Sequence, residues 1–352
     1  MTHIRFIEIL KDYLNEHNIS NREFSARIGI TPKHLIDILS GNIELSTSII
    51  QSIAIVTNIP AEYILKMEEN YRMECEIVKF LKNNDISLTQ YLNRFSFKEL
   101  INNNWIKFTY IDNKMTSMMD ILKYLRVSNP ENLYKLDKNI LYKSKNDKPE
   151  MLMLWLEKCF RIASKQNVGK YDKKNIDKLV KFILYNAIEG KFDENNLINI
   201  FNQNGIQVVL QDDLPGSKIR GAFKVNKETP AIYLTHKYKR IADIYFALLH
   251  ELAHCKSDFN KAKATNLVSY DNKNSEGRAD KQAVNWMVDD EYYKRIVDDI
   301  NNDIKKENCF PKSFVLYRMA LDNHINYYDK HYQLYNHVID KKNSSILLKK
   351  YL

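Results

Sequence analysis

Two histidines and a glutamate stand at a spacing that could hold a metal ion. The run Leu248-Leu249-His250-Glu251-Leu252-Ala253-His254 reads His-Glu-x-x-His. One helical turn apart, two imidazoles can share a tetrahedral Zn²⁺ at about 2.0–2.1 Å. Glu251 beside them can take a proton from a metal-bound water. The pattern predicts a catalytic metal site; the alternative is a surface helix with two solvated histidines.

Apolar residues around the motif repeat at helical spacing. At about 100° per residue, five of them fall within about 100° of arc on one side of a helix: Ile241, Ile244, Tyr245, Leu248 and Leu252. His250 and His254 lie at about 180° and 220° from Ile241. The apolar stripe can therefore pack in a core while both imidazoles point away from it together.

A third ligand would come from a second helix, which Glu276 opens. This helix follows a polar stretch, 258–275, that we expect to form a loop. Glu276 and Asp280 stand one turn apart on the side of Ala279 and Ala283, and small side chains let two helices approach closely. Glu276 could then reach the metal while Asp280 braces an imidazole N–H as an outer partner. The alternative is that Glu276 only favours the helix N-terminus and that Asp280 is solvated.

Three short strand signals, over 205–210, 219–225 and 230–235, precede the motif helix. A turn at Asp212–Ser217 joins the first two, so we expect a small antiparallel sheet. We also expect the third strand to pair with an extended substrate backbone. No oxyanion donor can be named, since Tyr233 and His236 are only neighbours in sequence.

The whole chain has the composition of a mostly helical α+β protein with two or more domains. It has 352 residues, 44% hydrophobic and 28% charged, with only 8 Gly and 7 Pro. We expect no transmembrane helix and no signal peptide, because no run of 18 apolar residues occurs and charges interrupt the N-terminus. Four cysteines without a C-x-x-C pattern fit free thiols, so we expect a cytoplasmic protein. Cys255 follows His254 directly and should point elsewhere on the helix.

The N-terminal region carries start and stop signals for five short helices. The second and third are separated by a glycine turn, as in a helix-turn-helix. The signals are a capping box at Ser20-x-x-Glu23, Gly29, Thr31 as a cap before Pro32, Ser46 as a further cap, and Pro60 at the start of a helix to Tyr71.

The pattern from Asn21 to Gly41 resembles the XRE/Cro-type DNA-binding family, and residues 58–71 resemble its HigA-like antitoxin branch. In that family the third helix enters the major groove. The resemblance implies an operator DNA as partner and six contact residues: Thr31, Lys33, His34 and Asn42 towards DNA, with Asn21 and Arg22 near phosphates at a helix start.

The charge of this region argues against DNA binding. Residues 1–70 hold six basic and nine acidic side chains, a balance of −3, whereas the whole chain carries +9. Phosphate neutralisation supplies much of the affinity for DNA. The alternative is therefore a helical bundle that has lost DNA binding or that forms a homodimer.

The C-terminal motifs, in their order and spacing, resemble the ImmA/IrrE family of zinc metallopeptidases. The matching pieces are 210–215, 218–222, 230–235, 247–254 and 276–283. The resemblance implies a zincin-like domain with Zn²⁺ on His250, His254 and Glu276, and Glu251 as catalytic acid/base. Family members cleave partner repressors. This chain departs from the family at Ala253, where Gly is usual, at Arg278, where an acid is usual, and at 287–290, where an apolar-Pro sequence is usual.

These resemblances divide the chain into four parts. We expect a helix-turn-helix over 1–71, a helical connecting region over 72–149, the peptidase domain over 150–295 and a helical extension over 296–352. The best linker candidate is 143–149. In the extension, His324, His331 and His337 are too widely spaced for a compact tetrahedral site.

The sequence thus predicts a transcriptional regulator with a zinc-dependent peptidase that cleaves a repressor or another regulator. The rival hypothesis is a DNA-binding, antitoxin-like regulator without proteolysis. Its zinc domain would be a sensor, or would bind a cognate toxin or another partner.

Overall fold

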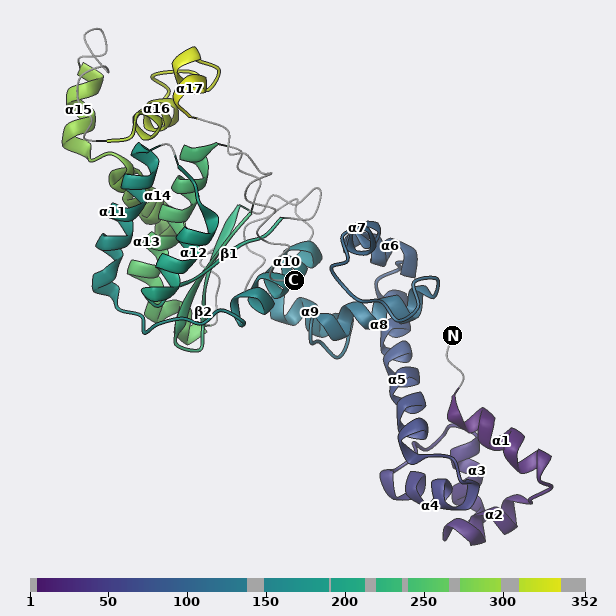
Figure 1. The fold of residues 1–352 in the computed structure, drawn as a ribbon. Helices are drawn as coiled ribbons and strands as arrows, with labels where there is room; N and C mark the ends of the chain where they lie inside the picture. Colours follow the sequence, from purple (N-terminus) through teal and green to yellow (C-terminus); the bar gives the residue numbers. More distant parts are fainter. Residues whose placement is uncertain are drawn as a thin grey trace. The chain divides into compact units, whose positions relative to one another are not determined.

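The structure is a computed structural model of the 352-residue chain. It describes residues 5–137, 149–189, 191–212, 220–235, 240–265, 273–298 and 310–336. The chain divides into two compact units, residues 1–135 and 136–352. The first is helical and the second combines helices with one sheet (Figure 1). Of the helices that the structure describes, none is both long and apolar enough to cross a membrane.

The first unit begins with the helices that the sequence predicts. The N-caps form: Ser20 Oγ accepts from the Glu23 amide at 3.2 Å, and Thr31 Oγ1 accepts from the His34 amide at 3.2 Å. Only this half of the predicted capping box at Ser20 forms, because the Glu23 carboxylate accepts from Arg27 Nη2 at 2.6 Å instead. Gly29 takes φ 75° in the turn between the second and third helices, where glycine avoids the steric cost of a side chain. The bounds are α1 Phe6–Glu16, α2 Asn21–Ile28, α3 Pro32–Leu39, α4 Thr47–Thr57 and α5 Ala61–Asn83.

Helix α5 continues to Asn83, well past the expected end at Tyr71. Its second half buries Ile77, Phe80 and Leu81 against the rest of the unit, so the apolar face of one long helix serves two helical groups. Phe80 and Tyr91 meet with ring centroids 5.1 Å apart. The remaining helices are α6 Leu88–Arg94, α7 Phe97–Asn102, α8 Lys114–Tyr124 and α9 Pro130–Asp137.

The second unit contains a three-stranded sheet of order β1-β3-β2. The strands are β1 Gln207–Leu210, β2 Gly221–Asn226 and β3 Thr229–Leu234. β2 pairs with β3 antiparallel, but β1 pairs with β3 parallel. The predicted antiparallel sheet with a hairpin between the first two strands is therefore wrong. β1 ends and β2 begins opposite the same residue, Leu234, but on opposite sides of β3.

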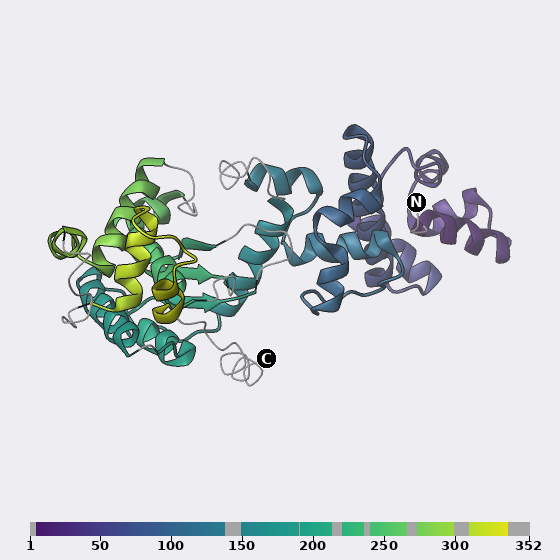
Figure 2. The same cartoon turned by 90° about the horizontal axis from the view of Figure 1, so that it is seen from above.

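Helices cover both faces of this sheet, which explains why β1 is buried along its whole length. Helix α10, Pro149–Ala163, packs on one face, where Trp155 meets Tyr233 edge-on and donates to the Gln211 carbonyl at 3.1 Å. Helix α13, Ile241–Thr265, packs on the other face, and both views of the fold agree on this arrangement (Figures 1 and 2).

The other elements of the second unit complete the core around α13. They are η1 Lys173–Asn175, α11 Ile176–Ile188, α12 Glu194–Gln203, α14 Lys273–Met287, α15 Asp290–Asp298, α16 Lys312–Leu321 and α17 Lys330–Tyr335. Ala279 and Ala283 of α14 are buried, as the small-residue face predicts. The loop expected over 258–275 is shorter, because α13 extends to Thr265 and α14 starts at Lys273. Alanine and lysine, both good helix formers, dominate the end of α13.

Candidate metal centre

Helices α13 and α14 bring His250, His254 and Glu276 together. The two Nε2 atoms lie 3.1 Å apart, and the Glu276 oxygens lie 3.4 Å from His250 Nε2 and 3.3 Å from His254 Nε2. A tetrahedral ion with bonds of about 2.0–2.1 Å would space its ligand atoms about 3.3–3.4 Å apart. The two Nε2 atoms and the Glu276 carboxylate, which faces His250 through Oε2 and His254 through Oε1, are therefore close enough together to share one Zn²⁺. In the described part of the chain, this triangle of three residues is the only such group of histidine, cysteine and carboxylate side chains.

A carboxylate lies against the other nitrogen of each imidazole. His250 Nδ1 is 2.8 Å from Asp280 Oδ1, and His254 Nδ1 is 2.8 Å from Asp258 Oδ2. A carboxylate accepts the Nδ1 proton, which leaves the Nε2 lone pair free. Two lone pairs and a carboxylate then converge on one point, and this donor set fits a divalent cation.

Asp258 is itself held in place. Ser275 Oγ donates to Asp258 Oδ2 at 2.6 Å, and Arg278 Nη2 donates to Asp258 Oδ1 at 2.5 Å. Asp258 was not predicted as a partner of His254, because the stretch 258–275 was expected to form a loop. Its position four residues after His254 on a continued helix was the available signal. Arg278, which stands where the resembled family usually has an acid, supports His254 through this aspartate.

Charges at the site shift its pKa values strongly. Burial opposes protonation of His250, but hydrogen bonds to Asp280 and Glu276 raise its pKa to about 10. Burial also opposes protonation of His254, whose pKa is nevertheless raised, with Glu276 as the main cause. Burial opposes ionisation of Glu276 and would raise its pKa. Hydrogen bonds from both imidazoles outweigh this effect and hold the pKa of Glu276 far below the usual value. The cluster therefore favours positive charge between the imidazoles and Glu276.

Glu251 is buried beside the triangle, with 6% of its surface exposed. Its Oε2 atom has no hydrogen-bond partner among the described residues. Burial raises its pKa, although the charges of His250 and His254 act in the opposite direction. A buried carboxyl with a raised pKa suits a group that takes up and releases a proton.

Gly221 of β2 makes room for the Glu251 side chain. A Cβ atom at residue 221 would lie 2.8 Å from Glu251 Oε1 and 3.2 Å from Leu234 Cδ2. The sequence reasoning missed Gly221, because only the packing of β2 against α13 reveals the close approach. Glycine is required here for space.

Of the other residues considered from sequence, none that the structure describes belongs to the triangle. Cys255 is fully buried in the core of the unit, and Tyr233 faces α10, where Asn226 donates to its hydroxyl at 3.0 Å. His324 lies near the Tyr293 ring. His236, the His331 side chain and His337 lie outside the described residues.

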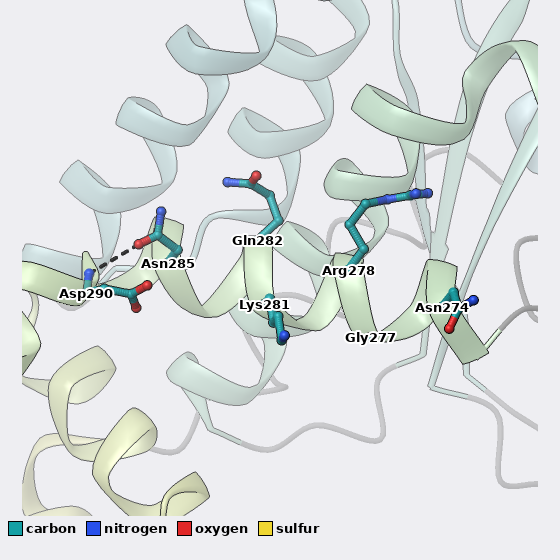
Figure 3. Close-up of a pocket in the computed structure, with 7 residues that line it drawn as sticks. All are labelled: Asn274, Gly277, Arg278, Lys281, Gln282, Asn285 and Asp290. Atoms are coloured by element: carbon teal, nitrogen blue, oxygen red, sulfur yellow. Dashed lines mark hydrogen bonds between the residues drawn. The ribbon is translucent and has the colours of Figure 1, made fainter.

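A groove of about 610 Å³ runs along α14 and is separate from the triangle (Figure 3). At about 100° per residue, the lining residues on α14 lie about 100–240° around the helix from Glu276. Figure 3 shows Arg278 and Gln282 extending to the same side of α14, and the Asp290 amide donating to Asn285 at 3.2 Å. The groove is lined by Asn274, Gly277, Arg278, Lys281, Gln282, Asn285 and Asp290.

The residues predicted to contact DNA lie on and around α3. Asn21, Arg22, Thr31, Lys33 and Asn42 are exposed. The Thr31 hydroxyl already caps α3. His34 is half-buried, and its Nε2 has no hydrogen-bond partner within the part of the chain that the structure describes. Five of the six side chains are therefore accessible.

Comparison with known proteins identifies the N-terminal part. Residues 10–64 match the helix-turn-helix family model. This match supports the predicted XRE-type helix-turn-helix and, with it, a DNA-binding transcriptional regulator. No curated protein and no solved structure matches the chain. The resemblance of the C-terminal motifs to the ImmA/IrrE family stays a prediction.

Proposed function

We propose that this DNA-binding regulator is also a zinc-dependent peptidase that cleaves a partner repressor or another regulator. The proposal has His250, His254 and Glu276 as zinc ligands and Glu251 as the catalytic acid/base. The observation that carries it is the convergence of both imidazole Nε2 atoms, 3.1 Å apart, on the Glu276 carboxylate, whose two oxygens lie 3.3 and 3.4 Å from them, beside the buried Glu251.

The side chains around the triangle would divide the work of peptide hydrolysis. A bound Zn²⁺ would supply Lewis acidity and lower the pKa of a bound water towards about 7. Asp258 and Asp280 fix the orientation of the two imidazoles. Glu251 accepts the proton that the attacking water loses and returns it to the leaving amine.

The extended substrate would pair with β2. The expectation that the third strand takes up the substrate is wrong, because β3 is the central strand and both of its edges are already paired. β2 is an outer strand of the described sheet, and its Gly221 lies against Glu251. A peptide added along β2 would gain backbone hydrogen bonds close to the catalytic carboxyl.

Co-expression with candidate repressors, followed by mass spectrometry of the fragments, tests this function. The wild type should yield one specific cleavage. Glu251→Gln should retain zinc but lose the fragments, whereas Glu291→Gln, an exposed change on α15, should cleave normally. Unchanged cleavage by zinc-loaded Glu251→Gln would refute the proposed acid/base.

A second candidate is an antitoxin-like regulator whose zinc domain is a sensor or binds a toxin. It is favoured by the helix-turn-helix match, which covers the DNA-binding part alone. Under this hypothesis Glu251→Gln would repress its promoter as well as the wild type, and no fragment of a partner would appear.

A further inference from the structure

A groove in the first unit lies between α4, α5 and the turn before α9. Its volume is about 600 Å³, within the range of about 300–1,000 Å³ that small-molecule sites occupy. The apolar side chains of Leu45, Ile50, Leu65 and Met73 form part of its wall. The groove can therefore bury the apolar body of a small ligand.

The charged residues of the remaining wall are mainly acidic. Glu68, Glu69 and Glu76 line the groove with one basic residue, Arg72. Glu69 pairs with Lys66 at 2.7 Å, and Arg72 pairs with Glu44 at 3.0 Å. The one guanidinium in the wall is thus already engaged, and the wall carries a net negative charge.

Glu68 is the residue that points to a ligand. Only 4% of its surface is exposed, and its Oε1 atom is buried without a hydrogen-bond partner among the residues described. Its Oε2 atom makes a long ion pair with Arg5 Nε, at 3.7 Å. A buried carboxylate oxygen that lacks a donor is unfavourable, and a charged donor would relieve this cost most effectively.

We propose that the groove binds a small organic cation, an ammonium group on an apolar body, with Glu68 as the recognition residue. A rotation of the Glu68 side chain would bring Oε1 to the groove, where the ammonium would donate to it while the apolar body packs against Leu65 and Met73. A neutral or anionic molecule of the same shape would leave the carboxylate without its charged partner.

Glu68 also connects the groove to the DNA-binding helices. Arg5, its ion-pair partner, lies over the Tyr71 ring at 5.0 Å, and a Cβ on Gly41 would lie 2.5 Å from Arg5 Nη1. Gly41 follows α3 and precedes Asn42, a predicted DNA contact. A ligand that binds Glu68 weakens the ion pair between Glu68 and Arg5. The loop after α3 then shifts, and the affinity for DNA changes with it. This coupling rests on DNA binding by the helix-turn-helix, whereas ligand binding itself does not.

The test is calorimetric titration of the full-length protein with 4-phenylbutylamine. The matched probes are 4-phenylbutan-1-ol, which is neutral, and 5-phenylpentanoate, which is anionic. The amine should bind at least about tenfold more tightly than either, as expected for a charge-assisted hydrogen bond. Equal affinities, or no saturable amine binding, would overturn the proposal.

Variants locate the site. Glu68→Gln should weaken amine binding about tenfold or more, whereas Glu62→Gln, exposed on the same helix and outside the groove, should not. Leu65→Trp fills the groove without touching the ion pair and should abolish binding, which keeps the test valid if Glu68→Gln unfolds. Full amine binding by folded Leu65→Trp would refute the site. Titration of promoter DNA with and without the amine then tests the coupling separately.

Discussion

Gly221→Ala should slow catalysis while leaving the proposed metal ligands intact. The new methyl group would lie 2.8 Å from Glu251 Oε1, 3.3 Å from Glu251 Cγ and 3.2 Å from Leu234 Cδ2. The carboxylate is the flexible end of a side chain, whereas Gly221 is held in β2 by its pairing with Leu234. The carboxylate is therefore the group that moves.

The displacement can be estimated from the contact distance. An ordinary van der Waals contact requires about 3.4 Å, so Glu251 Oε1 must shift by about 0.6 Å or more. A misplacement of about 1 Å in an active site can cost about 100-fold in rate. We therefore expect kcat to fall by about 10- to 100-fold, with little change in zinc affinity.

The assay combines cleavage rate with zinc stoichiometry on the same preparations. Gly277→Ala is the matched control: it lies next to Glu276, yet a Cβ there would meet no described atom within 4 Å. Alanine also favours the helix, so this variant should bind zinc, cleave normally and melt no lower than the wild type. Wild-type kcat in zinc-loaded Gly221→Ala would show that the position of Glu251 is not critical, and would refute this reasoning.

Three further predictions concern the metal and the N-terminal helices. Asp258→Asn should weaken zinc affinity about 10- to 100-fold in a chelator competition. The loss should be larger than for Asp280→Asn, since Asp280 is the more exposed partner. An equal loss of affinity in both variants would contradict this ranking. Zinc at about 100 times its Kd should stabilise the folded protein by about 2.7 kcal/mol. The melting temperature should therefore be higher with zinc than with a chelator. An unchanged melting temperature would count against zinc binding to the folded state. Thr31→Ala removes the cap of α3 and should lower the unfolding free energy by about 1 kcal/mol in a denaturant titration. The conservative Thr31→Ser keeps a hydroxyl and should retain most of that free energy. Equal losses for the two variants would rule out the cap as the cause.

Local signals in the sequence predicted the helices of the first unit well. Ser20, Thr31 and Ser46 each accept a backbone amide three residues on, as N-caps do. Gly29 adopts the left-handed conformation that its turn requires. These features depend on a few neighbouring residues, so they can be read without the tertiary structure. The end of α5 could not be predicted from neighbouring residues, because packing against the rest of the unit extends this helix.

The sheet shows the limit of local reasoning. Each strand was located to within a few residues, but the pairing of β1 with β3 joins segments more than twenty positions apart. The turn-forming residues after β1 suggested a hairpin with β2. The neighbouring sequence does not indicate that β3 lies between β1 and β2 in the sheet. Burial of β1 on both faces was the physical constraint that decided its place.

The triangle of His250, His254 and Glu276 was partly predictable, because one part of it depends on local spacing and the other on tertiary packing. His250 and His254 share one helix, so their spacing fixes their geometry. Glu276 required an inference about helix packing, which its distances to both imidazoles match. Asp258 and Gly221 were missed, since one depended on the true length of α13 and the other on an approach between β2 and α13.

X-ray absorption at the zinc edge, on the purified full-length protein loaded with one equivalent of zinc, tests the central claim most directly. The account predicts a first shell of nitrogen and oxygen at about 2.0–2.1 Å with imidazole scattering and no sulfur. His254→Ala should lose this signal. A sulfur shell at about 2.3 Å, or a His254→Ala spectrum identical to that of the wild type, would place the metal elsewhere and contradict the assigned site.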